Sequence, residues 1–126
     1  MDIKKSYAIV GASSNPEKYG YKVTLSLKEL GFVVIPINPK DGTILDLKAY
    51  STLGDAIKAK KIIDCIVFVV PPAVTENVLV EAKNLGIKEV WMQPGSESDA
   101  SIKFCEQNGI KCTHHACIMK FYGNVK

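Results

Sequence analysis

The stretch SYAIVGASSNPEKYG, Ser6 to Gly20, decides the fold predicted for this sequence. Its first part, Ser6 to Gly11, is a short apolar run that ends at a glycine, as a buried strand does before a tight turn. Small and polar residues follow, and from about Tyr19 to Leu30 apolar residues return at helical spacing. We therefore predict a strand, a loop of small residues and a helix.

Strand and helix signals alternate through the rest of the chain. The segment from Asp64 to Val70 is continuous and apolar, as expected for a strand that helices cover on both faces. Residues 39–61 give a weaker pattern, which predicts only a short helix from Ser51 or Thr52 to Ile57. The other predicted strands are Phe32 to Asn38, Glu89 to Gln93, and Ile110 to about His115; the other predicted helices are Val74 to Leu85 and a helix through about Gln107, preceded by a capping box at Ser96 and Asp99.

Short links between these helices and strands imply parallel strands joined by right-handed crossovers. The sequence thus predicts an α/β fold, a single Rossmann-like, doubly wound, mainly parallel sheet of about five strands with helices on both faces. The chain has 126 residues, of which 47% are hydrophobic, and this is enough to bury one core. We expect residues 1–126 to form a single domain.

Lysine is the only strong base in the chain, with 16 lysines, no arginine and 13 acidic residues. Because base-edge readout of DNA depends on the rigid fork of arginine, no nucleic-acid partner is expected. The apolar run from Tyr7 to Val10 is too short for a signal peptide, and no stretch has the length of a transmembrane helix. We expect a cytoplasmic protein without a membrane partner.

A ligand site is predicted at the carboxyl ends of the strands, where open parallel sheets bind ligands at the point of strand-order reversal. If the first strand neighbours the strand from Asp64 to Val70, the loop Gly11 to Asn15 faces the segment Val70 to Pro72 there. Small residues that lead into a helix let backbone N–H groups approach a phosphate. The alternative is a tight turn without a ligand.

Common nucleotide-binding motifs are incomplete in this loop. A Walker A motif fails at Pro16 to Lys18, and a GxGxxG fingerprint fails at Ser13 and Pro16. After the second strand, Asn38-Pro39-Lys40 places a lysine where NAD-binding folds carry an acidic residue for the ribose. Lysine favours a phosphorylated ribose, as in NADP or coenzyme A, over NAD; the alternative is a solvated loop lysine.

Five short motifs occur together in this sequence: GASSNPEKYGYKV (Gly11 to Val23), PINPK (Pro36 to Lys40), VPP (Val70 to Pro72), WMQPGS (Trp91 to Ser96) and ACIM (Ala116 to Met119). Through them, and over nearly its whole length, the chain resembles the small CoA-binding protein family, which is related to the CoA-binding domain at the start of succinyl-CoA synthetase α subunits. The resemblance implies a Rossmann-like, nucleotide-binding domain whose ligand is coenzyme A or an acyl-CoA.

The same resemblance implies where the parts of coenzyme A lie. The pyrophosphate would contact Gly11, Ala12, Ser13 and Ser14, with Lys18, Tyr19 and Gly20 closing over it; the ribose and its 3′-phosphate would lie along Asn38, Pro39 and Lys40; adenine or the pantetheine arm would lie against Val70, Pro71 and Pro72; and Gln93 and Gly95 would line the neighbouring rim.

Cys117 follows the last predicted strand at the same rim. The family carries charged residues around its late cysteine, whereas this chain has His115 and Ala116 before it and Lys120 after it. We predict that Cys117 is a CoA contact with a lowered pKa, close enough to the CoA thiol to form a mixed disulfide. The alternative is a buried, inert cysteine.

Four residues of metal-ligand type, Cys112, His114, His115 and Cys117, fall within six positions. Side chains alternate along an extended strand, so Cys112 and His114 should point one way and the other two the opposite way. No metal site is predicted. The remaining cysteines, Cys65 and Cys105, are expected to be small core residues.

The leading functional prediction is non-catalytic binding of coenzyme A, by a carrier, sensor or regulatory module. Ligation by this chain alone is not expected, because the domains with which acyl-CoA synthetases perform it are not in the sequence. Two alternatives stay open: an NADP-binding oxidoreductase, and a CoA-linked thiol-redox protein that uses Cys117. A homodimer is expected from the apolar sheet edges, and no protein partner is identified.

Overall fold

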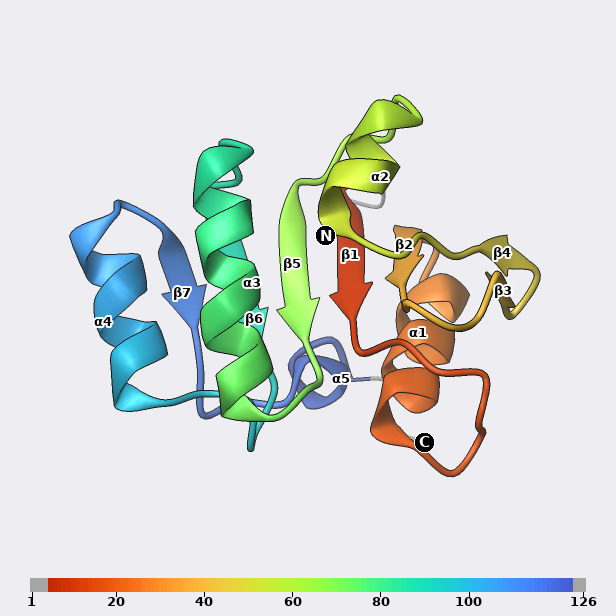
Figure 1. The fold of residues 1–126 in the computed structure, drawn as a ribbon. Helices are drawn as coiled ribbons and strands as arrows, with labels where there is room; N and C mark the ends of the chain where they lie inside the picture. Colours follow the sequence, from red (N-terminus) through yellow and green to blue (C-terminus); the bar gives the residue numbers. More distant parts are fainter. Residues whose placement is uncertain (1–4, 124–126) are drawn as a thin grey trace.

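The structure, a computed structural model, describes residues 5–123 and has the predicted architecture (Figure 1). One parallel sheet contains β1 (Ser6–Val10), β2 (Val33–Ile37), β5 (Cys65–Phe68), β6 (Glu89–Met92) and β7 (Lys111–Thr113). The strand order is β2-β1-β5-β6-β7, so the order reverses between β1 and β5, as predicted. The arrows of β1, β5 and β7 point downward in Figure 1, which places the carboxyl ends at its lower edge.

Helices cover both faces of the sheet, which confirms the doubly wound prediction. One core lies under α2 (Leu53–Lys58), α3 (Pro72–Asn84) and α4 (Asp99–Gln107). The other lies under α1 (Tyr19–Glu29), α5 (Ile118–Phe121) and the small hairpin β3 (Thr43–Ile44) and β4 (Leu47–Lys48). Strand β5 contributes side chains to both cores, because successive side chains of a strand point to opposite faces. Ile66 and Phe68 pack in the first core, and Cys65 and Val67 pack in the second.

None of the helices in residues 5–123 has the length and apolar character that crossing a membrane requires. The helix before β7 also differs from its prediction at its start. Its capping box is formed by Ser98 and Ser101 rather than by Ser96 and Asp99. Ser96 is buried instead, and its hydroxyl donates to the carbonyl oxygen of Phe68 at 3.0 Å. Ser96 therefore ties the loop after β6 to the end of β5.

Two glycines allow the start of α1 to approach the end of β1. A Cβ atom at Gly20 would lie 1.9 Å from the carbonyl oxygen of Gly11. Gly11 itself has a φ of +99°, and a Cβ atom there would lie 2.3 Å from the carbonyl oxygen of Val69. Only glycine fits at both positions, so β1, the end of β5 and the start of α1 meet at the carboxyl edge.

The outer edge of the sheet at β2 contains a proline, Pro36, that pairs in register with Ile9 of β1. Its carbonyl oxygen points away from β1 and accepts a hydrogen bond from the N–H of Tyr50 at 3.0 Å. The N and O atoms of one strand residue point to the same side, so the missing N–H of Pro36 also faces outward. Proline therefore costs this sheet no hydrogen bond between strands.

We expect Gly20→Ala to lower the free energy of unfolding by about 2 kcal/mol, because an overpacked Cβ must push apart two backbone segments. Higher helix propensity of alanine offsets only about 1 kcal/mol of the clash. Urea unfolding measures the change. Gly42→Ala is the matched control, since nothing lies within 4 Å of a Cβ atom at Gly42. Equal midpoints for the two variants would contradict the close contact.

Candidate functional site

Three adjoining cavities lie at the carboxyl edge of the sheet. The central cavity, of about 480 Å³, is lined by the loop after β1 and the first residues of α1. It shares Tyr19 and Val69 with a larger cavity of about 680 Å³. On its other side it shares Gly11 and Asn38 with a smaller cavity of about 350 Å³. The large and small cavities also share Val70. The three adjoining cavities, together called the trough, lie where the strand order reverses.

Most of the predicted site residues line this trough, and two do not. Ser14 and Lys40 lie outside the linings of the three cavities, and Lys40 is exposed. The predicted residues in the central cavity are Gly11, Ala12, Ser13, Lys18, Tyr19, Gly20 and Asn38; those in the small cavity are Gly11, Asn38, Pro39 and Val70; and those in the large cavity are Tyr19, Val70, Pro71, Pro72, Gln93, Gly95 and Cys117.

Asp41, which the sequence analysis did not identify, organises the loop after β1. Its carboxylate accepts hydrogen bonds from the hydroxyl of Ser14 at 2.9 Å and from the backbone N–H of Ser14 at 3.3 Å. Asn38 joins the same group, because its side-chain amide donates to the carbonyl oxygen of Ala12 at 2.7 Å. The donors of Ser14 are thus directed to Asp41 and away from the central cavity.

The central cavity has features that favour an anion. No side chain caps helix α1, whose N-cap residue is Lys18, and the first two helical residues, Tyr19 and Gly20, line the cavity. N–H groups in the first turn of a helix carry a partial positive charge that attracts anions. Lys18 adds a full positive charge to the lining, and Glu17 adds a negative one. The cavity therefore suits a group that accepts hydrogen bonds from backbone N–H groups, such as a phosphate.

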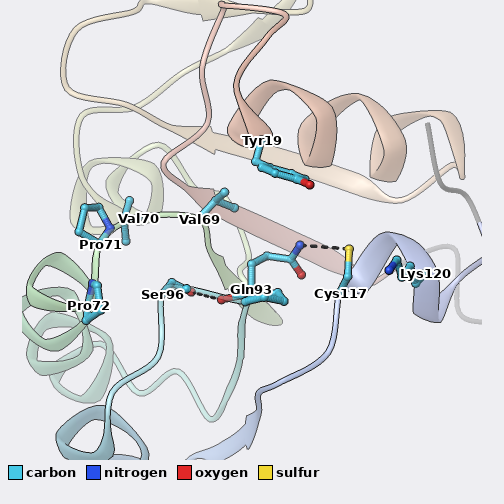
Figure 2. Close-up of a pocket in the computed structure, with 11 residues that line it drawn as sticks. Tyr19, Val69, Val70, Pro71, Pro72, Gln93, Ser96, Cys117 and Lys120 are labelled. Atoms are coloured by element: carbon cyan, nitrogen blue, oxygen red, sulfur yellow. Dashed lines mark hydrogen bonds between the residues drawn. The ribbon is translucent and has the colours of Figure 1, made fainter.

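The large cavity has an apolar wall and a polar wall (Figure 2). Val69, Val70 and three prolines form most of the apolar wall. Across from them, the side-chain amide of Gln93 points to the thiol of Cys117, with Lys120 beside it. A long, mainly apolar chain with a polar end suits this combination.

Gln93 fixes the loop that carries Cys117. Its side chain is 4% exposed, and its Nε2 atom donates to the sulfur of Cys117 at 3.4 Å. Its Oε1 atom accepts a hydrogen bond from the N–H of Ile118, at the start of α5, at 2.8 Å. Trp91 anchors the same loop, because its indole N–H donates to the carbonyl oxygen of Ala116 at 2.8 Å. Both ends of Cys117 are therefore held against β6.

Cys117 is half-buried and differs in acidity from the core cysteines. Partial burial opposes its ionisation, but hydrogen bonds from Gln93 and from the backbone of Lys120 and Met119, with the charge of Lys120, outweigh burial and lower the pKa of Cys117. Burial instead raises the pKa of Cys65. Cys65 and Cys105 are buried in the two cores, as predicted. The thiol at the cavity is thus the more readily ionised one.

The histidines before Cys117 are arranged differently from the prediction. The rings of His114 and His115 contact each other, with their centroids 4.6 Å apart. The predicted alternation was wrong because β7 ends at Thr113 and His115 has a φ of 59°, which no extended strand has. Within residues 5–123, no three His, Cys, Asp or Glu side chains lie where they could hold a metal ion.

Several lining residues could not be identified from local sequence patterns. Lys120 lies on α5, a helix of four residues that is too short to show a periodic pattern. Glu81 lies on α3 and lines the small cavity together with Thr52. Asp41 lies outside the three linings, but the Asn38-Pro39 turn before it is a local signal, because the side-chain oxygen of Asn38 accepts a hydrogen bond from the backbone N–H of Asp41 at 3.0 Å.

We expect Gln93→Glu to raise the pKa of Cys117, because glutamate keeps an acceptor for Ile118 but offers the sulfur no donor. Below its pKa the thiolate fraction falls as the pKa rises, so alkylation of Cys117 by iodoacetamide at neutral pH should slow by roughly tenfold. Peptide mass spectrometry measures the rate, and Cys112 in the same digest is the control. An unchanged rate at Cys117 would contradict the role given to Gln93.

The chain is similar to proteins of known sequence and structure. The model described as "CoA binding domain" matches residues 5–122. The ADP-forming acetate–CoA ligase of Methanocaldococcus jannaschii is 39% identical over 84 residues, which is 67% of this chain and 12% of the ligase. The α subunit of ADP-forming acetate–CoA ligase II of Pyrococcus furiosus is 33% identical over 87 residues, 68% of this chain and 18% of the subunit.

Among solved structures, a conserved hypothetical protein of Pyrococcus furiosus superposes with a TM-score of 0.87 and 41% identity, covering 93% of this chain and 98% of that one. The present chain spans less than a fifth of the length of the two ligase chains. The family model, by contrast, covers nearly the whole of the present chain. On this match and on the fold and trough described above, the chain belongs to the CoA-binding domain family.

Proposed function

We propose that this chain binds coenzyme A, or an acyl-CoA, along the trough, without catalysing a reaction on it. The observation that carries the proposal is the character of the three adjoining cavities. Coenzyme A has a nucleoside at one end, a pyrophosphate in the middle and a pantetheine arm at the other end. The central cavity has the features of an anion site and adjoins two largely apolar cavities, which also share Val70 with each other. Each part of the ligand thus has a cavity of matching character next to the anion site.

The direction of the ligand follows from the sheet. In dinucleotide-binding Rossmann folds the ribose lies at the end of the second strand, which here is the position of Asn38 and Pro39. The adenosine therefore belongs in the small cavity. The pantetheine arm then crosses the large cavity, and its thiol or acyl group ends near Cys117.

Two lysines are proposed as phosphate contacts. Lys18 lines the central cavity and would pair with the pyrophosphate. Lys40 is exposed and follows Pro39, which lines the small cavity, and it would pair with the 3′-phosphate on the ribose. As an exposed, flexible side chain, Lys40 can reach a phosphate that extends into solvent.

The setting of the protein is part of the same proposal. We propose a carrier, sensor or regulatory role in the cytoplasm, as a homodimer and without a nucleic-acid or membrane partner. The ligases named above supply the link to CoA, since their names describe proteins that act on it. The groups along the central cavity are chiefly donors for binding: helix N–H groups, a hydroxyl and a lysine.

A thermal-shift panel of CoA, acetyl-CoA, NADP, NAD and ATP tests the proposal. At a free concentration of about 100 times Kd, CoA should raise the Tm by roughly 8–12 °C, through preferential binding to the folded state. Lys18→Met should reduce that shift, because it removes a charge from the central cavity. A shift with NADP and none with CoA would contradict the proposal and favour an NADP-binding oxidoreductase.

A second function, CoA-linked thiol exchange, is favoured by the position and lowered pKa of Cys117. In this reaction the Cys117 thiolate attacks one sulfur of a CoA disulfide. A disulfide forms between Cys117 and one CoA, the original disulfide breaks, and the second CoA leaves as a thiolate that takes up a proton. The CoA disulfide is the oxidant, and the Cys117 sulfur is oxidised.

Intact mass under non-reducing conditions tests this second function. Incubation with CoA disulfide should add the mass of one CoA less two hydrogens, one from the CoA thiol and one from the Cys117 thiol, and peptide mapping should place the adduct on Cys117. Cys117→Ser should abolish the adduct while leaving the thermal shift with reduced CoA in place. A wild-type protein that forms no adduct, beside a control thiol protein that does, would contradict thiol exchange and leave simple CoA binding.

A further inference from the structure

Glu81 is the ionisable side chain of the small cavity. Among the described residues that line this cavity, no other is charged, and most are apolar: Val70, Val74, Val78, Ile37 and Leu53. Glu81 lies on α3, one helical turn after Val78, and is half-buried. A carboxylate therefore stands in a wall that is otherwise suited to a flat, apolar ring.

The carboxylate of Glu81 makes no hydrogen bond or ion pair with another residue in the range 5–123. Its Oε2 atom lies beside the backbone of α2, 3.4 Å from the position that a Cβ atom would occupy at Gly54. Glu81 is itself one of the residues that line the small cavity. Removing a carboxylate from water without a partner is unfavourable, so a ligand that brings a hydrogen-bond donor to Glu81 gains more than one that does not.

We infer that Glu81 recognises the base of the bound nucleotide, by accepting a hydrogen bond from the exocyclic amino group of adenine. The inference rests on the proposed function and deepens it, since it names a residue that selects the base. A purine with a carbonyl oxygen at the same ring position presents an acceptor to the carboxylate, and two acceptors repel. Hydrogen bonds to a charged acceptor are the stronger class, which makes this contact a selective one.

Isothermal titration calorimetry with CoA and with its deaminated analogue, in which hypoxanthine replaces adenine, tests the inference. The wild-type protein should bind CoA at least about tenfold more tightly than the analogue. Glu81→Gln should reduce this preference to about threefold or less, because a carboxamide can donate to the carbonyl oxygen of hypoxanthine.

Glu76→Gln is the matched control, with the same charge change on the same helix. The carboxylate of Glu76 accepts a hydrogen bond from the hydroxyl of Ser98 at 2.7 Å, and Glu76 does not line the small cavity. This variant should keep the full preference for CoA. Comparing Glu81→Gln with Glu76→Gln thus distinguishes recognition of the base from a general effect of removing a charge from α3.

Two results would overturn the inference while leaving the proposed function in place. The first is equal binding of CoA and its analogue by the wild-type protein. The second is a Glu81→Gln variant that keeps the preference, with or without a lower Tm, which would assign Glu81 to the stability of α2. If the wild-type protein gave no heat with CoA, the proposed function itself would fail.

Discussion

The contact of Gly20 with the carbonyl oxygen of Gly11 is the constraint on which the site depends. No side chain can stand between these two backbones, because a Cβ atom at Gly20 would lie 1.9 Å from that oxygen. Helix α1 therefore begins directly beside the end of β1, and Gly11 in turn lies against Val69 after β5. The central cavity lies where these three backbones meet, and the other two cavities share residues with it. A trough of this shape is the result of backbone proximity more than of any polar side chain.

The two cores hold in place the strands whose ends carry the trough. Strand β5 is fully buried and sends alternate side chains into both, so the loop that continues it, with Val69 and Val70, starts from a fixed position. Polar groups at the other strand ends are held by hydrogen bonds between loops, such as Asp41 with Ser14 and Gln93 with Ile118. These polar groups thus lie on loops, while the scaffold that positions them is apolar and closely packed.

The sequence allowed the fold to be predicted, and most residues of the predicted site line the trough, because both depend on local patterns. The continuous apolar run that became β5 and the small-residue loop after β1 each carry their own signal. The features that the sequence did not predict depend on contacts between segments that are distant in the chain. Asp41 meets Ser14 across 27 positions, and Glu81 reaches the small cavity from a helix whose apolar stripe says nothing of its carboxylate. His115 adopts a positive φ that no residue pattern around it indicates.

Pro36 has a consequence for how copies of this molecule can meet. At that position the outer edge of β2 offers no N–H to a further strand, and the neighbouring backbone groups already bond to Tyr50. The opposite edge, β7, has only three residues. Growth of the sheet from one molecule into the next, the route by which exposed strands aggregate, is therefore blocked on one side and short on the other. A homodimer of this chain would be joined by side chains packed between the copies, and its sheets would stay separate.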